Sequence, residues 1–176
     1  MVIIESERLL LRELEASDTE ALAHIWGDNE VMKYCGGGEL DTNIIHEVIE
    51  ANQKKYRAYG YAVFAIVVKP DGVLVGAAGC KPEEADPRRG ELIYHFNKAV
   101  WGKGYASEAV AAYLKWAAET GCIDYISASA MSENAASLRI LEKNGFKQNG
   151  FVQFEDTGFV PEPFYERYLM PVPYSG

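Results

Sequence analysis

The sequence predicts a single mixed α/β domain spanning residues 1–176. Short apolar, β-branched runs alternate with segments whose apolar residues recur at helical spacing, in the order β-αα-βββ-α-β-α-ββ. No internal repeat or low-complexity linker divides the chain. Its 176 residues, 48% hydrophobic and 24% charged, suit one globular domain that needs no disulfide or metal in order to fold.

The N-terminal third predicts one strand and two helices. Ile3-Ile4 and then Leu9-Leu10-Leu11 predict a first strand over 3–13. Ser17-Asp18 has the composition of a helix N-cap, and the apolar spacing after it predicts the first helix. The second helix is expected to begin after a cap at Asp41 and to end before Gly60.

The remaining residues predict six strands and two helices. The turn at Pro70-Asp71-Gly72 joins the first two of these strands as an antiparallel hairpin, and an exposed loop is expected over 81–90. The expected strands cover 61–68, 73–79, 92–97, 124–130, 146–154 and 164–170, and the expected helices cover 105–119 and 134–144.

The stretch 99–109 carries the most specific chemical signal. It joins an expected strand to an expected helix through Gly102-Lys103-Gly104. The first N–H groups of a helix have no partner within the helix, and the helix dipole makes this end positive. The glycines allow positive φ and close approach of the backbone to a ligand, while Lys103 adds a cation. These features predict a site for a phosphate or pyrophosphate.

A plain tight turn between a strand and a helix remains an alternative interpretation of this stretch. A P-loop is excluded, because the spacing G-x-x-x-x-G-K-[ST] is absent. A dinucleotide-binding fingerprint is disfavoured, because Ser107 replaces its third glycine. Asp124 has the right separation for the ribose-binding acid, but it opens its strand, whereas that acid ends one.

Three motifs lie in order along the chain: Arg8-Leu9-Leu10-Leu11-Arg12 in the first strand, Glu91-Leu92-Ile93-Tyr94 followed by the turn from Trp101 to Ala109, and Asn134-Ala135-Ala136-Ser137 followed by Leu141-Glu142-Lys143-Asn144-Gly145-Phe146. Together they resemble the GNAT family of N-acetyltransferases, in particular its branch of ribosomal-protein N-terminal acetyltransferases. The resemblance covers nearly the whole chain. Trp101 takes a position that is Gln or Arg in much of the family.

The resemblance implies a central, mixed, mostly antiparallel twisted sheet of about seven strands with about four flanking helices, and acetyl-CoA as the co-substrate. The pantetheine arm would fill a wedge between two splayed strands and pair with backbone near Phe96. Asn134 would hydrogen-bond to the pantetheine, cap a helix, or do both. The residues implied in cofactor binding are Tyr94, Phe96, Trp101, Gly102, Lys103, Gly104, Tyr105, Ala106, Ser107, Asn134 and Ser137.

The implied reaction needs a base for the amine and an acid for the departing thiolate. Many relatives place a tyrosine acid where this chain has Leu141, so that assignment fails here. Ser137 takes the position of the acid used in the ribosomal-protein branch. Glu155, expected on the penultimate strand, and Glu91 are the candidate bases, and a water chain is an open alternative. His95 alternates with Phe96 and is expected to pack within its strand.

Charge and cysteine content exclude several classes of protein. The chain holds 26 acidic and 17 basic residues, and its net charge of −9 disfavours nucleic acid or an anionic membrane as a partner. Cys35, Cys80 and Cys122 form no C-x-x-C pair and are expected to be reduced thiols of a cytoplasmic protein. The three histidines are far apart, so no metal site is expected. No signal peptide or membrane span is expected either.

The leading interpretation is an N-acetyltransferase that acts on a protein N-terminus or on a small amine. A non-catalytic acyl-CoA-binding or regulatory module of the same fold and a nucleotide-binding protein are the alternatives, and a homodimer is possible. Residues 13–50 contain ten acidic residues and one basic residue, Lys33, which account for the whole net charge. This segment is expected either to attract a cationic amine or to be a solvated helical face.

Overall fold

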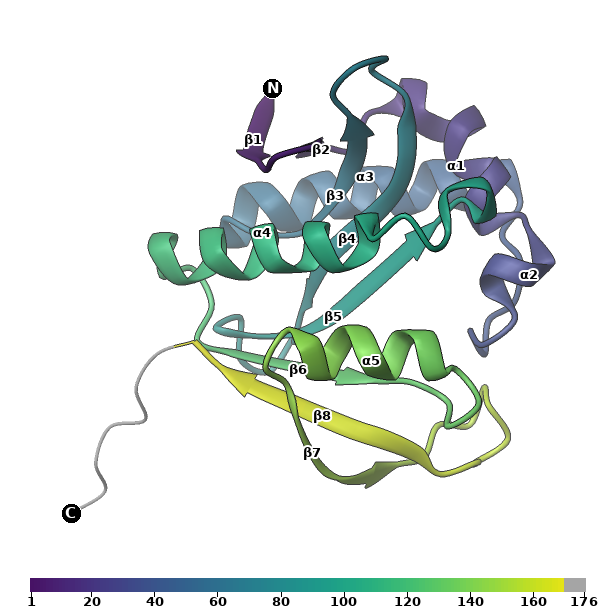
Figure 1. Ribbon diagram of the computed structural model, residues 1–176, viewed down its shortest axis with the longest axis vertical. Coiled ribbons are helices and arrows are strands. Elements are labelled where there is room, and N and C mark those ends of the chain that lie inside the picture. The colour runs from purple at the N-terminus through teal and green to yellow at the C-terminus, as the bar shows by residue number, and fades with distance from the viewer. Residues whose placement is uncertain (170–176) are drawn as a thin grey trace.

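The computed structural model describes residues 1–169. It contains one open eight-stranded sheet in which every neighbouring pair of strands is antiparallel except the fifth and sixth. This architecture confirms the predicted mixed α/β class. The strands are β1 (Val2–Glu5), β2 (Leu9–Glu13), β3 (Val63–Val68), β4 (Leu74–Pro82), β5 (Arg89–Phe96), β6 (Tyr125–Ser129), β7 (Lys147–Val152) and β8 (Glu162–Tyr168), arranged in the order β1-β2-β3-β4-β5-β6-β8-β7 (Figure 1).

Helices cover both faces of the sheet. The long helix α4 lies on one face and α3 on the other, and α5 covers the part of the sheet formed by β6 and β8 (Figure 1). The helices are α1 (Thr19–Trp26), α2 (Asn29–Met32), α3 (Thr42–Tyr59), α4 (Tyr105–Thr120) and α5 (Ala135–Lys143), with short 3₁₀ helices η1 (Ala16–Asp18) and η2 (Lys98–Val100).

The N-terminal run forms two strands, where the sequence predicted one over 3–13. The Ser6 N–H donates to the Leu9 carbonyl at 3.0 Å, and the Ser6 hydroxyl accepts the Leu9 N–H at 3.2 Å. These bonds close a turn that folds β1 back onto β2. The break falls in the polar run Glu5-Ser6-Glu7-Arg8, which contains no glycine or proline to mark a turn.

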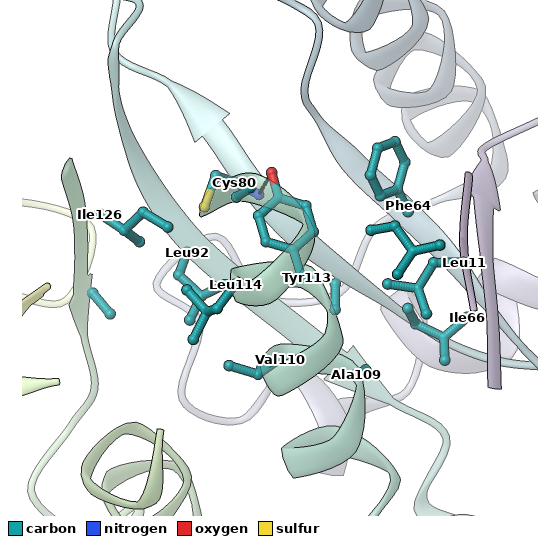
Figure 2. Packing of buried hydrophobic residues seen from close by; sticks show 14 of the residues in the cluster. Leu11, Phe64, Ile66, Cys80, Leu92, Ala109, Val110, Tyr113, Leu114 and Ile126 are labelled. Atoms are coloured by element: carbon teal, nitrogen blue, oxygen red, sulfur yellow. Dashed lines mark hydrogen bonds between the residues drawn. The ribbon is translucent and has the colours of Figure 1, made fainter. Parts of the chain in front are cut away.

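The core between α4 and the sheet is centred on Tyr113. Its ring is fully buried among apolar side chains of α4 and of the strands that lie to either side of this helix (Figure 2). Its hydroxyl accepts the backbone N–H of Cys80 at 3.1 Å, so the phenol is satisfied inside the core. This packing holds α4, and with it the glycine turn that precedes the helix, firmly on β4 and β5.

The helix caps agree with the predictions only in part. α3 begins at Asp41, whose carboxylate accepts two backbone N–H groups, and ends at Gly60 with φ of +78°. Asp18 precedes α1 as predicted but makes no cap bond to that helix. Its carboxylate instead accepts the Glu15 N–H in the capping box of η1 and binds Arg12 at 2.7 and 2.8 Å. The four-residue helix α2, capped by Asp28, was not predicted.

The last three strands do not lie in the sheet in the order in which they occur in the sequence. β8 lies between β6 and β7, so β7 is the edge strand. β8 ends at Tyr168, and Met170, the last residue of the strand predicted over 164–170, lies outside the described residues. β4 and β5 extend into both ends of the loop predicted over 81–90.

Candidate functional site

The candidate site lies where β5 and β6 separate. The two strands pair only at three positions, Arg89–Glu91 against Tyr125–Ser127, although β5 continues to Phe96 and β6 to Ser129. Beyond Glu91, the backbone groups on this edge of β5 have no strand partner among residues 1–169. Backbone N–H and C=O groups require hydrogen bonds, so this edge is suited to an extended ligand such as the predicted pantetheine arm.

The glycine turn at the end of β5 presents a set of free backbone donors. Gly102 and Gly104 have φ of +77° and +79°, and α4 begins directly after Gly104 without a side-chain cap. Among residues 1–169, no acceptor is bonded to the N–H groups of Gly104, Tyr105, Ala106 or Ser107. The N–H of Lys103 differs, because it donates to the Val100 carbonyl at 3.4 Å. The remaining donors lie at the positive end of a 16-residue helix, where a pyrophosphate would be stabilised.

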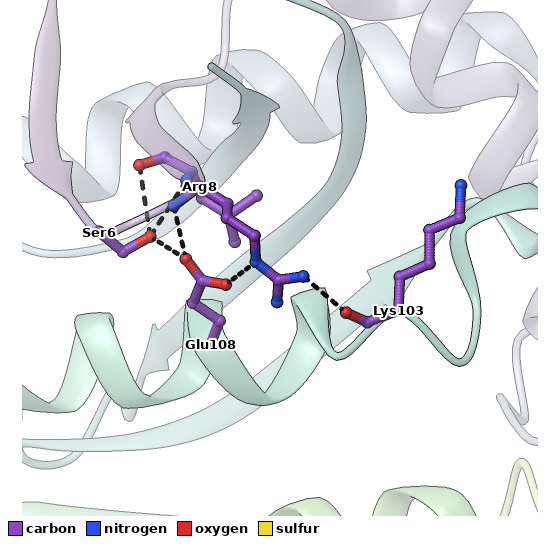
Figure 3. A network of polar contacts seen from close by, with 5 residues as sticks. Ser6, Arg8, Lys103 and Glu108 are labelled. Atoms are coloured by element: carbon purple, nitrogen blue, oxygen red, sulfur yellow. Dashed lines mark hydrogen bonds and ion pairs between the residues drawn. The ribbon is translucent and has the colours of Figure 1, made fainter. Parts of the chain in front are cut away.

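Arg8 holds the glycine turn from the side of the sheet (Figure 3). Its guanidinium donates to the Lys103 carbonyl at 2.9 Å and to the Glu108 carboxylate at 2.6 Å, and its side chain lies over the ring of Tyr105. Burial acts to raise the pKa of Glu108, but hydrogen bonds from Arg8 and Ser6 outweigh it and lower the pKa. Because Arg8 holds the carbonyl of the turn, the neighbouring N–H groups are left to face solvent.

Trp101 contacts the free edge of β5. Its ring is half exposed, and its indole N–H donates to the Phe96 carbonyl at 2.9 Å. The prediction placed the pantetheine arm beside this backbone group. A carbonyl oxygen has two acceptor sites, so the Phe96 carbonyl retains one. The Phe96 ring is buried in the core, which leaves only the backbone of this residue for a ligand.

The N-terminus of α5 brings together three of the predicted residues. The Asn134 side chain accepts the Ser137 N–H at 3.1 Å, so it caps the helix as one interpretation predicted. The Ser137 hydroxyl lies 2.7 Å from the Tyr94 hydroxyl, which is also 3.2 Å from the Ser137 carbonyl oxygen. Burial raises the pKa of Tyr94 to about 12, so its phenol stays protonated near neutral pH.

The two candidate bases, Glu91 and Glu155, differ in burial and in position. Glu91 is partly buried on β5, opposite Ser127 of β6, at the point where the two strands separate. Glu155 was expected on the penultimate strand, and this placement is wrong: β7 ends at Val152, and Glu155 lies in an exposed turn. The turn is closed by the Gly158 N–H, which donates to the Glu155 carbonyl at 3.0 Å.

His95 packs on the opposite face of the sheet from Tyr94, as predicted. Its Nδ1 accepts the indole N–H of Trp26 at 3.2 Å, and its Nε2 lies 3.1 Å from the Cys35 sulfur. Burial, with a contribution from Lys81, lowers the pKa of His95 to about 4, so the imidazole is neutral near pH 7. Burial also raises the pKa of Cys35, which keeps this thiol protonated.

Two contributors to this region, Arg8 and Glu162, were not predicted as site residues. Arg8 acts across about 100 residues of sequence. Tyr94 and Ser137 were both predicted, but the contact of their hydroxyls across 43 residues was not. Glu162, the first residue of β8, is a carboxylate that is only 5% exposed. The alternation along β8 was the only sequence signal that could have indicated which face Glu162 occupies.

A metal site and a membrane-spanning helix are both absent from residues 1–169. No group of three or more His, Cys, Asp or Glu side chains is placed to hold a metal ion. In the same part of the chain, no helix has the length and apolar character needed to cross a membrane.

Comparisons with known proteins agree with this geometry. Residues 8–147 match the family model described as the acetyltransferase (GNAT) domain. The chain is 28% identical over 154 residues to the uncharacterized N-acetyltransferase p20 of Bacillus licheniformis, covering 87% of this chain and 86% of that protein. A GNAT-family acetyltransferase from Bacillus anthracis superposes with a TM-score of 0.83 at 28% identity, covering 96% and 99% of the two chains. RimL, a ribosomal L7/L12 α-N-protein acetyltransferase solved with coenzyme A, superposes at 0.76 with 17% identity, covering 96% and 98%.

Proposed function

This chain belongs to the GNAT family of acetyltransferases, and from that premise we propose that it transfers the acetyl group of acetyl-CoA to a primary amine. The observation that carries the proposal is the set of unpartnered N–H groups from Gly104 to Ser107, which lies at the end of the strand β5. The free edge of β5 and the hydroxyl of Ser137 lie along the same path. A phosphate-bearing ligand with a long polar arm matches this arrangement of donors.

The residues that would hold acetyl-CoA follow from their hydrogen-bonding capacity. The N–H groups at the start of α4 would bind the pyrophosphate, with Lys103 at its rim. The backbone edge of β5 near Tyr94 and Phe96 would pair with the pantetheine amides. Asn134 uses its side-chain oxygen as a cap, and its NH₂ group is left to donate to the pantetheine.

The proposed reaction is direct attack of the amine on the thioester. The amine nitrogen bonds to the acetyl carbon, the C–S bond breaks, the nitrogen loses a proton and the sulfur gains one. Ser137 would donate that proton to the sulfur. Tyr94 would hold the Ser137 oxygen through their 2.7 Å contact, and its raised pKa keeps it a donor.

Three candidates exist for the base that receives the amine proton. Glu91 is supported by its place at the point where β5 and β6 separate. Glu155 is exposed in its turn and would need the turn to close over the acceptor. A chain of water molecules that acts as the base is the third alternative.

The class of acceptor is a protein N-terminus or a small amine. RimL, a structural neighbour, is named for acetylation of a ribosomal protein N-terminus, and this supports the first class at the level of the fold. The identity between the two chains is only 17%. The acidic segment 13–50, which contributes to the α1–α3 face, supports a cationic acceptor in either class.

Two measurements on the whole chain test this proposal. Calorimetric titration should show binding of CoA and no comparable binding of ATP or NAD. Thiol release from acetyl-CoA should then increase when a panel of primary amines is added. Binding of CoA without release on any amine would favour a non-catalytic acyl-CoA-binding module, and binding of ATP or NAD alone would favour a nucleotide-binding protein.

A further inference from the structure

Glu162 is a buried carboxylate without a partner. Its residue is 5% exposed, and within residues 1–169 no hydrogen bond or ion pair involves its side chain. Asp18, which is equally buried, binds the guanidinium of Arg12 instead. A carboxylate on a largely enclosed residue that has no partner in the protein is available to bind a cationic ligand.

The oxygens of Glu162 are accessible to solvent. In the described part of the chain, no side-chain nitrogen or oxygen is both enclosed and without a hydrogen-bond partner. Because the Glu162 carboxylate has no such partner, its oxygens must be accessible although the residue as a whole is buried. A ligand can therefore reach them.

The register of β8 fixes the face on which Glu162 lies. Tyr165 donates to Glu142 of α5, and Arg167 donates to the Asn144 carbonyl at the end of the same helix. Side chains alternate along a strand, so Glu162 lies on the face away from α5. The face away from α5 is the one covered by α1, where His95 of β5 contacts Trp26.

Cys35 and the turn that holds Asp156 lie near Glu162. The charges of Glu162 and Asp156 raise the pKa of Cys35 further, beyond the effect of burial, so both carboxylates lie within electrostatic range of its sulfur. A Cβ atom on Gly36 would lie 2.5 Å from Cγ of Asp156, so the loop after α2 packs directly against the turn before β8. The charge of Lys81 acts on the pKa of Cys35 in the opposite direction.

We propose that Glu162 binds the ammonium group of the acceptor and so positions a cationic amine at the site. The inference rests on the proposed acetyltransferase function. The acceptor would enter from the α1–α3 face and reach the thioester through the separation of β5 and β6, while acetyl-CoA lies on the α4–α5 face. An ammonium group would bind the unpaired carboxylate through charge-assisted hydrogen bonds. Before attack it loses one proton to Glu91 or to water, which frees the nitrogen lone pair. The nitrogen loses a second proton as the amide forms, and the CoA sulfur gains one.

Steady-state kinetics of Glu162→Gln tests this assignment against a matched control. The control is Glu166→Gln, on the same face of β8, whose carboxylate is already bonded to Tyr125 and Asn149. With acetyl-CoA saturating, the amine is whichever of benzylamine, tyramine, spermidine or a Ser-initiated peptide the wild type acetylates fastest. Glu162→Gln should raise the KM for this amine about 10- to 100-fold, as loss of a charged hydrogen-bond partner predicts. The KM for acetyl-CoA should not change.

The remaining outcomes separate this inference from the function on which it rests. Glu162→Asp should restore part of the amine KM, and Glu162→Gln should unfold at the same or a higher temperature than the wild type, because an unpaired charge is removed. An amine KM within twofold of the wild type, or a Glu162→Gln variant that fails to fold, overturns the inference alone. A wild-type enzyme that acetylates none of the amines overturns the proposed function instead.

Discussion

Side chains at the start of α5 carry the proposed acid chemistry. Ser137→Ala should lower kcat about 100-fold at saturating amine, because the thiolate would leave without a proton donor. Tyr94→Phe should lower kcat about tenfold, and the double variant should be no slower than Ser137→Ala, because the two hydroxyls act as one unit. Rapid-quench measurement of the acetylated amine, with CoA affinity measured in parallel, checks both effects. A Ser137→Ala enzyme within twofold of the wild-type kcat would remove the serine from the mechanism.

The buried His95 makes the stability of the fold sensitive to acid. Its pKa is lowered to about 4 from 6.5, chiefly by burial, so the unfolded chain binds a proton more readily than the folded one. The contribution of this neutral imidazole is therefore complete above pH 6.5 and is lost as the pH falls toward 4. The wild type should lose about 2 kcal/mol more unfolding free energy between pH 7.5 and pH 4.5 than His95→Asn loses. Urea unfolding at the two pH values measures the difference, and equal losses in the two proteins would contradict it.

At the scale of the elements, Arg8 links the first hairpin to the glycine turn. Arg8→Ala should raise the KM for acetyl-CoA about tenfold without changing the amine KM, because the Lys103 carbonyl would no longer be held and the N–H groups would lose their common direction. Arg8→Lys should restore only part of the affinity, since lysine lacks the fork that binds both Lys103 and Glu108.

The control for this prediction is Arg88→Ala. Arg88 forms an exposed ion pair with Asp124 at the opposite end of β5 from the turn, and its removal should change stability little because exposed ion pairs contribute little. Calorimetry with CoA compares the variants directly. If Arg8→Ala binds CoA as tightly as Arg88→Ala does, the proposed role of Arg8 in positioning the turn is wrong.

Local signals predicted the elements that depend on nearby residues. The β3–β4 hairpin, the helices α3, α4 and α5, and the positive φ of Gly102 and Gly104 all follow from turn residues, caps and periodicity. The turn between β1 and β2 was missed, because the polar run that forms it contains no glycine or proline. Glu155 was placed on a strand by the family resemblance, but β7 ends at Val152.

The site was predictable only where its parts are close in the sequence. The free N–H groups of the turn are a local property of a glycine turn followed by a helix. The contact of Arg8 with Glu108 joins residues 100 apart, and the isolation of Glu162 is visible only after β8 has been inserted beside β6. Neither relation leaves a periodic trace in the sequence.

At the scale of the whole molecule, the negative charge is concentrated on one face. Residues 13–50 supply the entire net charge of −9, and two of their acids, Asp28 and Glu30, share Lys98 beside the glycine turn. Most of the others are exposed on or beside α1–α3. If this face attracts a cationic acceptor, kcat/KM for the amine should fall about threefold as NaCl rises from 0.05 to 0.5 M, since salt screens long-range attraction. A kcat/KM that is independent of salt would identify the segment as a solvated helical face.

The most direct test of the account is a product balance for the wild-type enzyme. Acetyl-CoA and the amine panel are incubated with the protein, and mass spectrometry of the amines is compared with release of the CoA thiol. The account predicts N-acetylated amine and free CoA in equal amounts, with formation slowed about 100-fold in Ser137→Ala. Thiol release without an acetylated amine, or CoA binding with neither product, would contradict acetyl transfer to an amine as the function of this chain.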